Sequence, residues 1–165
     1  MVALKMEDLK NFTVQLFVGD TFDDWLVREA SIITFNAFTI DGHIRQGYYS
    51  ERELEENRIE ELSYWKVLKP ICYSLIKGKK LPESFQITLQ LKPTEVEEFL
   101  KNAQLDFTVD QINGLYMNIR YENNVIHCIS GTSLNIFTLD RQIEIEWDEA
   151  ARLFFKDRKI PFVEE

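Results

Sequence analysis

The alternation of hydrophobic and polar positions is clearest at residues 84–92. The apolar side chains recur at every second position, at Phe85, Ile87, Leu89 and Leu91, and polar ones stand between them. Successive side chains of a β-strand point to opposite faces, so this pattern predicts a strand with one buried face and one face in water. The intervening Gln86, Thr88 and Gln90 are predicted to lie on the face that is exposed to water.

A second alternation runs from Leu115 to Tyr121. Asn123-Asn124 follows it, and asparagine adopts positive φ more readily than most residues, which predicts a turn. We expect a return strand over residues 125–130 and, beyond Gly131, a third strand over residues 134–139. These three strands would form an antiparallel meander.

Apolar residues spaced three and four apart predict about four helices. The first covers about residues 6–18 and stops at Gly19; the second keeps its period from Leu62 to Leu75 through Pro70. A proline in a helix interior costs about 3 kcal/mol, so we expect either a kink or a new helix starting there. The third helix is expected to open at a Thr94/Glu97 capping box, and the last to carry Trp147, Ala150, Ala151 and Phe154.

Two acidic segments are less clearly assigned. Ser50 and Glu53 have the spacing of another capping box, and residues 50–62 fit either a helix or a loop. The conformation of residues 141–148 is also left open.

Residues 25–40 are rich in β-branched and aromatic residues and are apolar on both faces. This is compatible with one central strand, or with two strands broken near residues 29–31. Asp41-Gly42 then predicts a type I′ hairpin turn, because both of its central residues need positive φ. The return strand would run from His43 to about residue 49, with Ile40 opposite His43.

Together these elements predict an α+β fold in a single domain of residues 1–165, with a mostly antiparallel sheet of hairpins and a meander, and helices on one face. The order strand, helix, hairpin occurs twice: Leu4-Lys5 and Leu91-Lys92 each end a β-like run and precede a helix. Both a true duplication and a chance recurrence of this order fit the sequence.

The composition of the chain argues against certain classes of partner more than it indicates a function. The chain has a net charge of −9, and nucleic-acid binding relies on Lys and Arg displacing counterions, so a nucleic-acid partner is not expected. The lysines at 66, 69, 77, 79 and 80 are interpreted as a solvated helix end. No stretch approaches the roughly 18 apolar residues of a membrane span, so no membrane partner is expected.

A cytoplasmic location is expected, because residues 1–10 lack an export signal. Cys72 and Cys128 are expected to be reduced and buried. With His43 and His127 they are the only soft or borderline metal ligands, and no metal-binding spacing occurs, so we predict no metal and no cofactor. On its strand, His127 should point outward near Arg120, and Cys128 inward beside Ile119.

Asp41 and His43 are the strongest candidates for chemistry. With Arg45, and with Glu29 or Asp24, they could form a small enzyme site if the fold brings them together. The favoured interpretation is structural: Asp41-Gly42 makes a turn, and His43 is partly solvated beside it. Asp20, Asp23 and Asp24 lack the spacing of a calcium loop, and Asp20 or Thr21 is interpreted as the cap of the next element. We therefore expect a binding or interaction module with a protein partner or a second copy, and an enzyme as the alternative.

Four segments carry a resemblance over nearly the full chain. They are "GDTFDDWLVREASIITFNAFTIDGHI", "SLIKGKKLPESFQITLQL", "INGLYMNI" and "GTSLNIFTLD". In these segments the chain resembles an uncharacterised family of single-domain bacterial proteins of unknown function. The resemblance implies one domain and a bacterial cytosolic origin, and it implies no activity, cofactor or catalytic residue.

Overall fold

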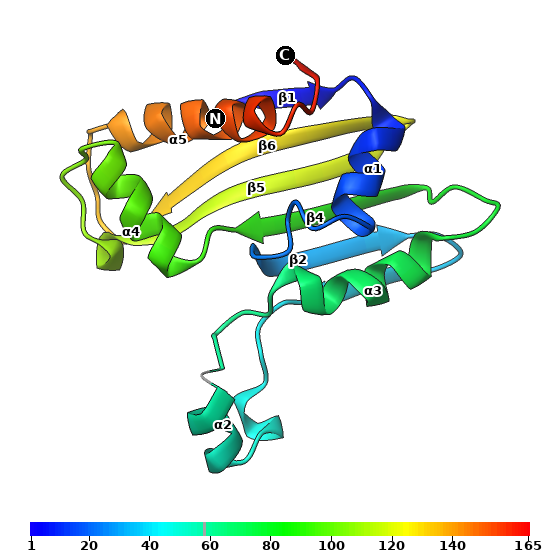
Figure 1. Cartoon of the computed structure of the whole chain (residues 1–165), viewed down its shortest axis with the longest axis horizontal. Helices are drawn as coiled ribbons and strands as arrows, with labels where there is room; N and C mark the ends of the chain where they lie inside the picture. The colour runs from blue at the N-terminus through cyan, green and yellow to red at the C-terminus, as the bar shows by residue number, and fades with distance from the viewer. Residues whose placement is uncertain (58) are drawn as a thin grey trace.

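A computed structural model describes residues 1–57 and 59–165, and these residues form an α+β fold around one antiparallel sheet (Figure 1). The sheet has seven strands in the order β3-β2-β4-β5-β6-β1-β7. The strands are β1 (Ala3–Met6), β2 (Leu26–Ile33), β3 (Ala37–Asp41), β4 (Ser84–Gln90), β5 (Ile112–Glu122), β6 (Val125–Leu134) and β7 (Phe162–Glu164). The α-helices are α1 (Leu9–Phe17), α2 (Glu51–Asn57), α3 (Trp65–Ile76), α4 (Pro93–Asn102) and α5 (Gln142–Asp157).

Four of these helices cover one face of the sheet, and α2 projects away from the body (Figure 1). Each long strand buries one alternate set of side chains, and the helices α1, α3, α4 and α5 each bury a stripe against them. The polar side chains of β4 lie on the opposite face, and no helix among the described residues covers that face (Figure 1). None of the helices among the described residues is both long and apolar enough to cross a membrane.

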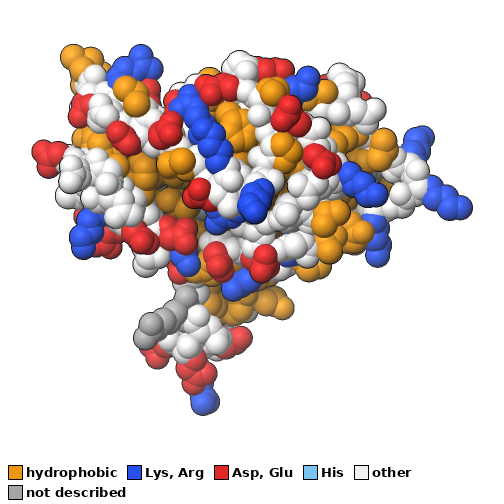
Figure 2. Space-filling view, turned by 45° about the horizontal axis from the view of Figure 1, so that its top comes forward, with side chains coloured by type: hydrophobic (Ala, Val, Ile, Leu, Met, Phe, Trp, Pro, Cys, Tyr) orange, Lys and Arg blue, Asp and Glu red, His pale blue; other side chains and the backbone are white. Residues whose placement is uncertain are grey.

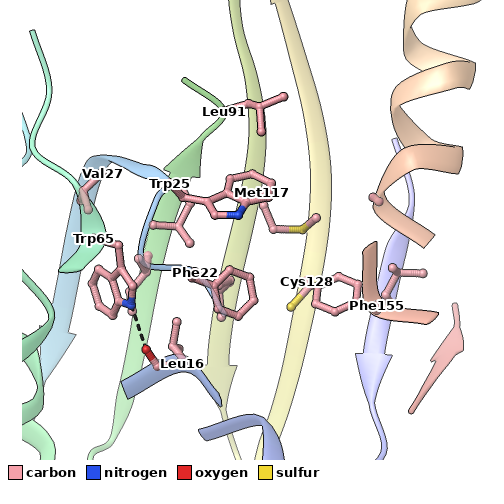
Figure 3. Close-up of a cluster of buried hydrophobic side chains, with 14 of the residues drawn as sticks. Leu16, Phe22, Trp25, Val27, Trp65, Leu91, Met117, Cys128 and Phe155 are labelled. Carbon is pink, nitrogen blue, oxygen red and sulfur yellow. Dashed lines mark hydrogen bonds between the residues drawn. The ribbon is translucent and has the colours of Figure 1, made fainter. Parts of the chain in front are cut away.

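The core is rich in aromatic rings, several of which come from outside the regular elements (Figure 3). Phe22 and Trp25, in the connection between α1 and β2, are 0% and 6% exposed. Trp65 of α3 is fully buried, and its indole Nε1 donates a 2.8 Å hydrogen bond to the carbonyl oxygen of Leu16. This bond joins α3 to α1 and satisfies a polar group that would otherwise be buried without a partner.

Several sequence predictions are confirmed. β4 buries Phe85, Ile87 and Leu89 and leaves its polar residues on the open face. Asn123 and Asn124 have φ of 53° and 60° and turn β5 into β6. Among residues 50–62, α2 opens with a reciprocal capping box, in which Ser50 Oγ accepts from the backbone of Glu53 and the Glu53 carboxylate accepts from the backbone of Ser50.

The predicted turn at Asp41-Gly42 is wrong. Residues 25–40 do form two strands, but the hairpin turns at residues 34–36, where the Thr34 amide donates to the Asn36 carbonyl at 3.0 Å. Ile40 therefore pairs with Ala30 and not with His43. The one glycine with positive φ among the described residues is Gly78, so Gly42 is not left-handed.

Gly42 is needed for a different reason, which is the close approach of two backbones. A Cβ at this position would stand 1.7 Å from the carbonyl oxygen of Val27. The Gly42 amide donates to Arg28, and its carbonyl accepts from Ser63, at 3.0 and 2.9 Å. Residues 42–44 thus lie between the bulged start of β2 and residues 61–63, and His43 makes one isolated bridge with Leu62 instead of starting a strand.

Three further expectations are corrected. The third strand at residues 134–139 is absent, because Gly131 continues β6, opposite Tyr116, up to Leu134. α4 starts at Pro93, which is favoured at the first helical position, so the Thr94/Glu97 box does not form. Gly19 follows α1 without positive φ, so it is not the left-handed stop that was expected. Of the two alternatives at Pro70, a new helix is excluded, because α3 runs through the proline as a single helix.

The strand, helix, hairpin order does occur twice, as β1-α1-β2-β3 and as β4-α4-β5-β6. The pairing differs between the two. β4 lies beside β5 of its own hairpin, whereas β1 lies between β6 and β7. The recurrence in sequence order therefore does not correspond to two equivalent halves of the sheet.

Candidate functional site

Asp41 and His43 form a local hydrogen-bonded turn at the surface. The Asp41 carboxylate Oδ1 accepts from the His43 backbone at 3.0 Å and lies 2.7 Å from ring Nδ1 of the same residue. The backbone bond is the main cause that lowers the pKa of Asp41, and the ring adds to it. Their side chains are 67% and 43% exposed, so water surrounds both groups.

The other predicted catalytic residues are only partly brought together. Glu29 pairs directly with Asp41 across β2 and β3, on the open face of the sheet. Arg45 makes a small electrostatic contribution to the lowered pKa of Asp41. Asp24 lies in the connection before β2, where Lys66 Nζ is 3.7 Å from its carboxylate.

The histidines and cysteines lie in separate local environments. Across the described ranges, no three His, Cys, Asp or Glu residues are placed to hold a metal ion. His127 points outward opposite Arg120, and its Nε2 lies 2.8 Å from the Glu165 carboxylate. Cys72 and Cys128 are free and buried, and burial raises the pKa of both thiols, that of Cys72 to about 11. Protonated, buried thiols are poor nucleophiles.

A groove between α4 and α5 has a more distinctive composition. A cavity of about 480 Å³ lies between the two helices, and its floor is formed by Trp25, Leu91, Phe99, Trp147 and Phe154. The rings hold one another edge to face: Phe99 and Trp147 are 5.5 Å apart, and Trp25 and Phe154 are 5.4 Å apart. Trp147 Nε1 also donates a 3.0 Å hydrogen bond to the Tyr116 carbonyl. The floor is therefore aromatic and fixed in place.

A smaller cavity of about 190 Å³ continues this groove toward the connection after α1. It shares Trp25, Leu91 and Phe154 with the first cavity and adds Asp20, Thr21 and Asp24. We call the two together the acidic groove. Its lining includes the carboxylates of Asp20, Asp24, Glu95, Glu98, Glu146, Glu149 and Asp157, against the single guanidinium of Arg158.

Only part of this negative charge is neutralised. Asp24, Glu95 and Glu149 each lie within 4 Å of a basic group, at Lys66, Lys92 and Arg152 respectively. In the part of the chain that the structure describes, Glu98 and Asp157 have no such partner and are exposed. Figure 2 shows the surface around α4 and α5, where hydrophobic side chains are bordered by red carboxylates. Carboxylates around an apolar recess concentrate negative potential in it.

The floor of the groove already holds one cation of the chain itself. The Arg158 guanidinium lies over the Phe154 ring, 3.8 Å from its centroid, and donates a 3.1 Å hydrogen bond to the Phe154 carbonyl. A cation at this distance is attracted by the negative face of the ring. The groove thus combines the two features that attract a cationic group, aromatic faces and nearby carboxylates.

Sequence reasoning missed this site. It interpreted Asp20 as a cap and considered Asp24 only for an enzyme site with Asp41 and His43, and it gave no role to the acidic residues beside the apolar stripes of α4 and α5. The available signal was local: Glu95 and Glu98 are one helical turn apart, as are Glu146 and Glu149. Each pair alone is typical of a solvated helix face, and only the fold places the pairs around one recess.

Comparison with known proteins gives a family and no activity. A family of unknown function, DUF5721, has a model that matches residues 15–163. No curated protein and no solved structure matches the chain significantly. The resemblance to an uncharacterised single-domain family is confirmed, and the bacterial origin stays a prediction.

Proposed function

The chain belongs to the DUF5721 family of unknown function, and we propose that it is a non-enzymatic binding module whose acidic groove holds a cationic, partly apolar segment of a protein. The observation that carries the proposal is the aromatic floor bordered by carboxylates that are only partly neutralised. A lysine or arginine could stack on the rings and pair with a carboxylate, while a neighbouring apolar side chain fills the recess. We place this activity in the cytoplasm, in keeping with two free, buried cysteines.

The dimensions of the groove support a peptide segment as the ligand. A cavity of about 480 Å³ has room for a few side chains and is open along the helices. The floor residues Trp25, Leu91 and Trp147 are buried, and the partly buried Phe99 and Phe154 are held by ring contacts, so little ordering of the protein is needed on binding. Most of the rim carboxylates lie on the two α-helices α4 and α5, which are rigid supports for a recognition surface.

A synthetic helical peptide of lysine and leucine tests the proposal, with a glutamate and leucine peptide as its charge-reversed control. We expect the cationic peptide to bind and to change the fluorescence of Trp25 and Trp147, which lie in the groove floor. Glu98→Gln/Asp157→Gln should weaken binding at least tenfold, which corresponds to about 1.4 kcal/mol. Equal affinity for both peptides would contradict the proposal.

Two variants separate the groove from general electrostatics. Glu7→Gln/Glu122→Gln removes the same charge from exposed positions outside the groove and should leave the peptide affinity nearly unchanged. Phe99→Ala removes one ring of the floor without changing charge and should also weaken binding. If the distant pair weakens binding as much as Glu98→Gln/Asp157→Gln, the peptide responds to net charge and not to the groove.

A second candidate function rests on the 2.7 Å contact between Asp41 and His43, with Glu29 opposite on the sheet. A carboxylate that orients a histidine is a common arrangement for general base catalysis. The exposure of both side chains weighs against it, because water competes for the same hydrogen bonds. A ligand screen by thermal shift decides: a compound that stabilises the wild type by several degrees but not His43→Ala would favour an enzyme or ligand site here.

A further inference from the structure

The end of the molecule opposite the acidic groove carries a basic, apolar surface. The loop that follows α3, residues 77–81, contains Lys77, Lys79 and Lys80 and ends at Leu81, which is 69% exposed. We call these residues the basic loop. Phe35, 82% exposed at the tip of the β2–β3 hairpin, lines the same depression of about 540 Å³. Large apolar side chains exposed this far are typical of interaction surfaces when they cluster.

The three lysines of the basic loop are available to form ion pairs with a binding partner. Among the described residues, none of its three lysines lies within 4 Å of a carboxylate. Figure 2 shows lysine and arginine side chains gathered at the right-hand end of the molecule, where the α3–β4 connection lies in Figure 1, while α4 and the groove lie toward the left. The chain thus carries a cationic, apolar segment and an anionic, aromatic recess at opposite ends of its long axis.

We infer that the occupant of the acidic groove is the basic loop of a second copy of this chain. The inference rests on the proposed function and names its partner. The lysines would enter between the carboxylates of the groove, and Leu81 would contact the aromatic floor. The two complementary surfaces lie at opposite ends, so one molecule cannot satisfy its own pair. The contact is therefore head to tail, and it leaves a free groove at one end of the assembly and a free loop at the other.

Another exposed apolar segment of the chain fits the groove less well. Residues 136–139 expose Phe137 and Leu139 by 91% and 86%, but they carry no lysine or arginine. Among the described residues, the basic loop places three lysines without an ion-pair partner beside a large exposed apolar side chain within five residues, whereas Lys66 and Lys69, beside the exposed Val67, are already paired with Asp24 and Asp23. Since the whole chain has a net charge of −9, copies repel one another in general, and this local match is what overcomes the repulsion.

Sedimentation velocity on purified protein tests the inference. The weight-average sedimentation coefficient of the wild type should rise between about 10 μM and about 1 mM, the range in which weak contacts form. Lys79→Glu/Lys80→Glu reverses two charges of the basic loop and should prevent the loop from binding; we call it the loop-blocked variant. Glu98→Lys/Asp157→Lys reverses two charges of the acidic groove and should prevent the groove from binding; we call it the groove-blocked variant. Each of these variants should remain a 19.6 kDa monomer throughout the range.

Mixing the two blocked variants gives the sharpest outcome. The loop-blocked variant keeps a native groove, and the groove-blocked variant keeps a native loop, so they should form a complex of twice the monomer mass that grows no further. Lys10→Glu/Arg120→Glu changes the net charge as much as the loop variant does, at exposed positions elsewhere. This control should still associate. A circular dichroism melt of every variant, with midpoints near that of the wild type, shows that each one is folded.

Two results would overturn the inference and are separable from failure of the proposed function. If the wild type stays monomeric while the lysine and leucine peptide binds the groove, the groove has another partner and the second copy is excluded. If the wild type associates but the mixture of blocked variants does not form the two-chain complex, the contact lies elsewhere. If neither self-association nor peptide binding is observed, the proposed function and the inference both fail.

Discussion

Replacing Gly42 by alanine tests whether the fold requires the close approach of backbones at residue 42, which lies between β2 and residue 63. The added Cβ would stand 1.7 Å from the carbonyl oxygen of Val27 and 2.5 Å from its carbonyl carbon. Both are backbone atoms of a paired strand, so no side-chain rotation relieves the clash. Moving residue 42 away strains its hydrogen bonds to Arg28 and Ser63. Overpacking costs about 1–3 kcal/mol and each weakened hydrogen bond about 1 kcal/mol, so we expect a loss of about 3 kcal/mol.

Urea denaturation followed by tryptophan fluorescence measures this loss, and a thermal melt should show a midpoint roughly 6–12 °C lower for a chain of this size. Gly47→Ala is the matched control, because an added Cβ there meets no atom within 4 Å. It should change the free energy of unfolding by no more than about 0.5 kcal/mol. If Gly42→Ala is as mild as Gly47→Ala, the close backbone approach is not a constraint on the fold and the reasoning is wrong.

Three further predictions concern the turn, the thiols and the core. Asn124 has a φ of 60°, so Asn124→Ala should cost about 1 kcal/mol in a urea titration, and Asn124→Gly less. Cys72 and Cys128 should react with a thiol reagent far more slowly in native than in unfolded protein. Burial in the fold raises the pKa values of both thiols from 9.0. The contribution of the two thiols to the free energy of unfolding should therefore be complete below pH 9.0 and lost as the pH rises toward the folded pKa, about 11 for Cys72. Trp65→Phe should cost about 2–4 kcal/mol by chemical denaturation, since it leaves a cavity and an unpaired Leu16 carbonyl; a loss below about 1 kcal/mol would contradict this.

The predictable parts of the fold were those in which local pattern and tertiary packing agree. In β4 and β5 the strict alternation matches burial against the helices, and Asn123-Asn124 adopts the positive φ that asparagine tolerates and the tight turn requires. Residues 25–41 gave no such signal, because they are apolar on both faces. The hairpin there turns at residues 34–36 without a glycine, and tertiary pairing with β4 decides its position.

The candidate groove could not be predicted for a related reason. Its lining comes from three segments, around Trp25, Phe99 and Phe154, which are far apart in the chain. In each segment, an acidic residue beside an apolar stripe is the normal composition of a helix boundary or a loop. The Asp-Gly-His sequence was predicted as a candidate site because its residues are close together in the sequence. In the structure its glycine allows two backbones to approach closely, and its aspartate accepts a hydrogen bond from the His43 amide.

The place of β1 in the sheet has a consequence for how the chain folds during synthesis. Lys5 pairs with His127 on one side and with Val163 on the other, so β1 is synthesised long before either of its neighbours in the sheet. At a typical translation rate of about 5–20 residues per second, the wait for β6 is roughly 6–24 s. During that time Leu4 and Met6, which end up buried, have no sheet to cover them. We therefore expect slow, late closure of the sheet, and sensitivity of the nascent chain to chaperones that bind apolar segments.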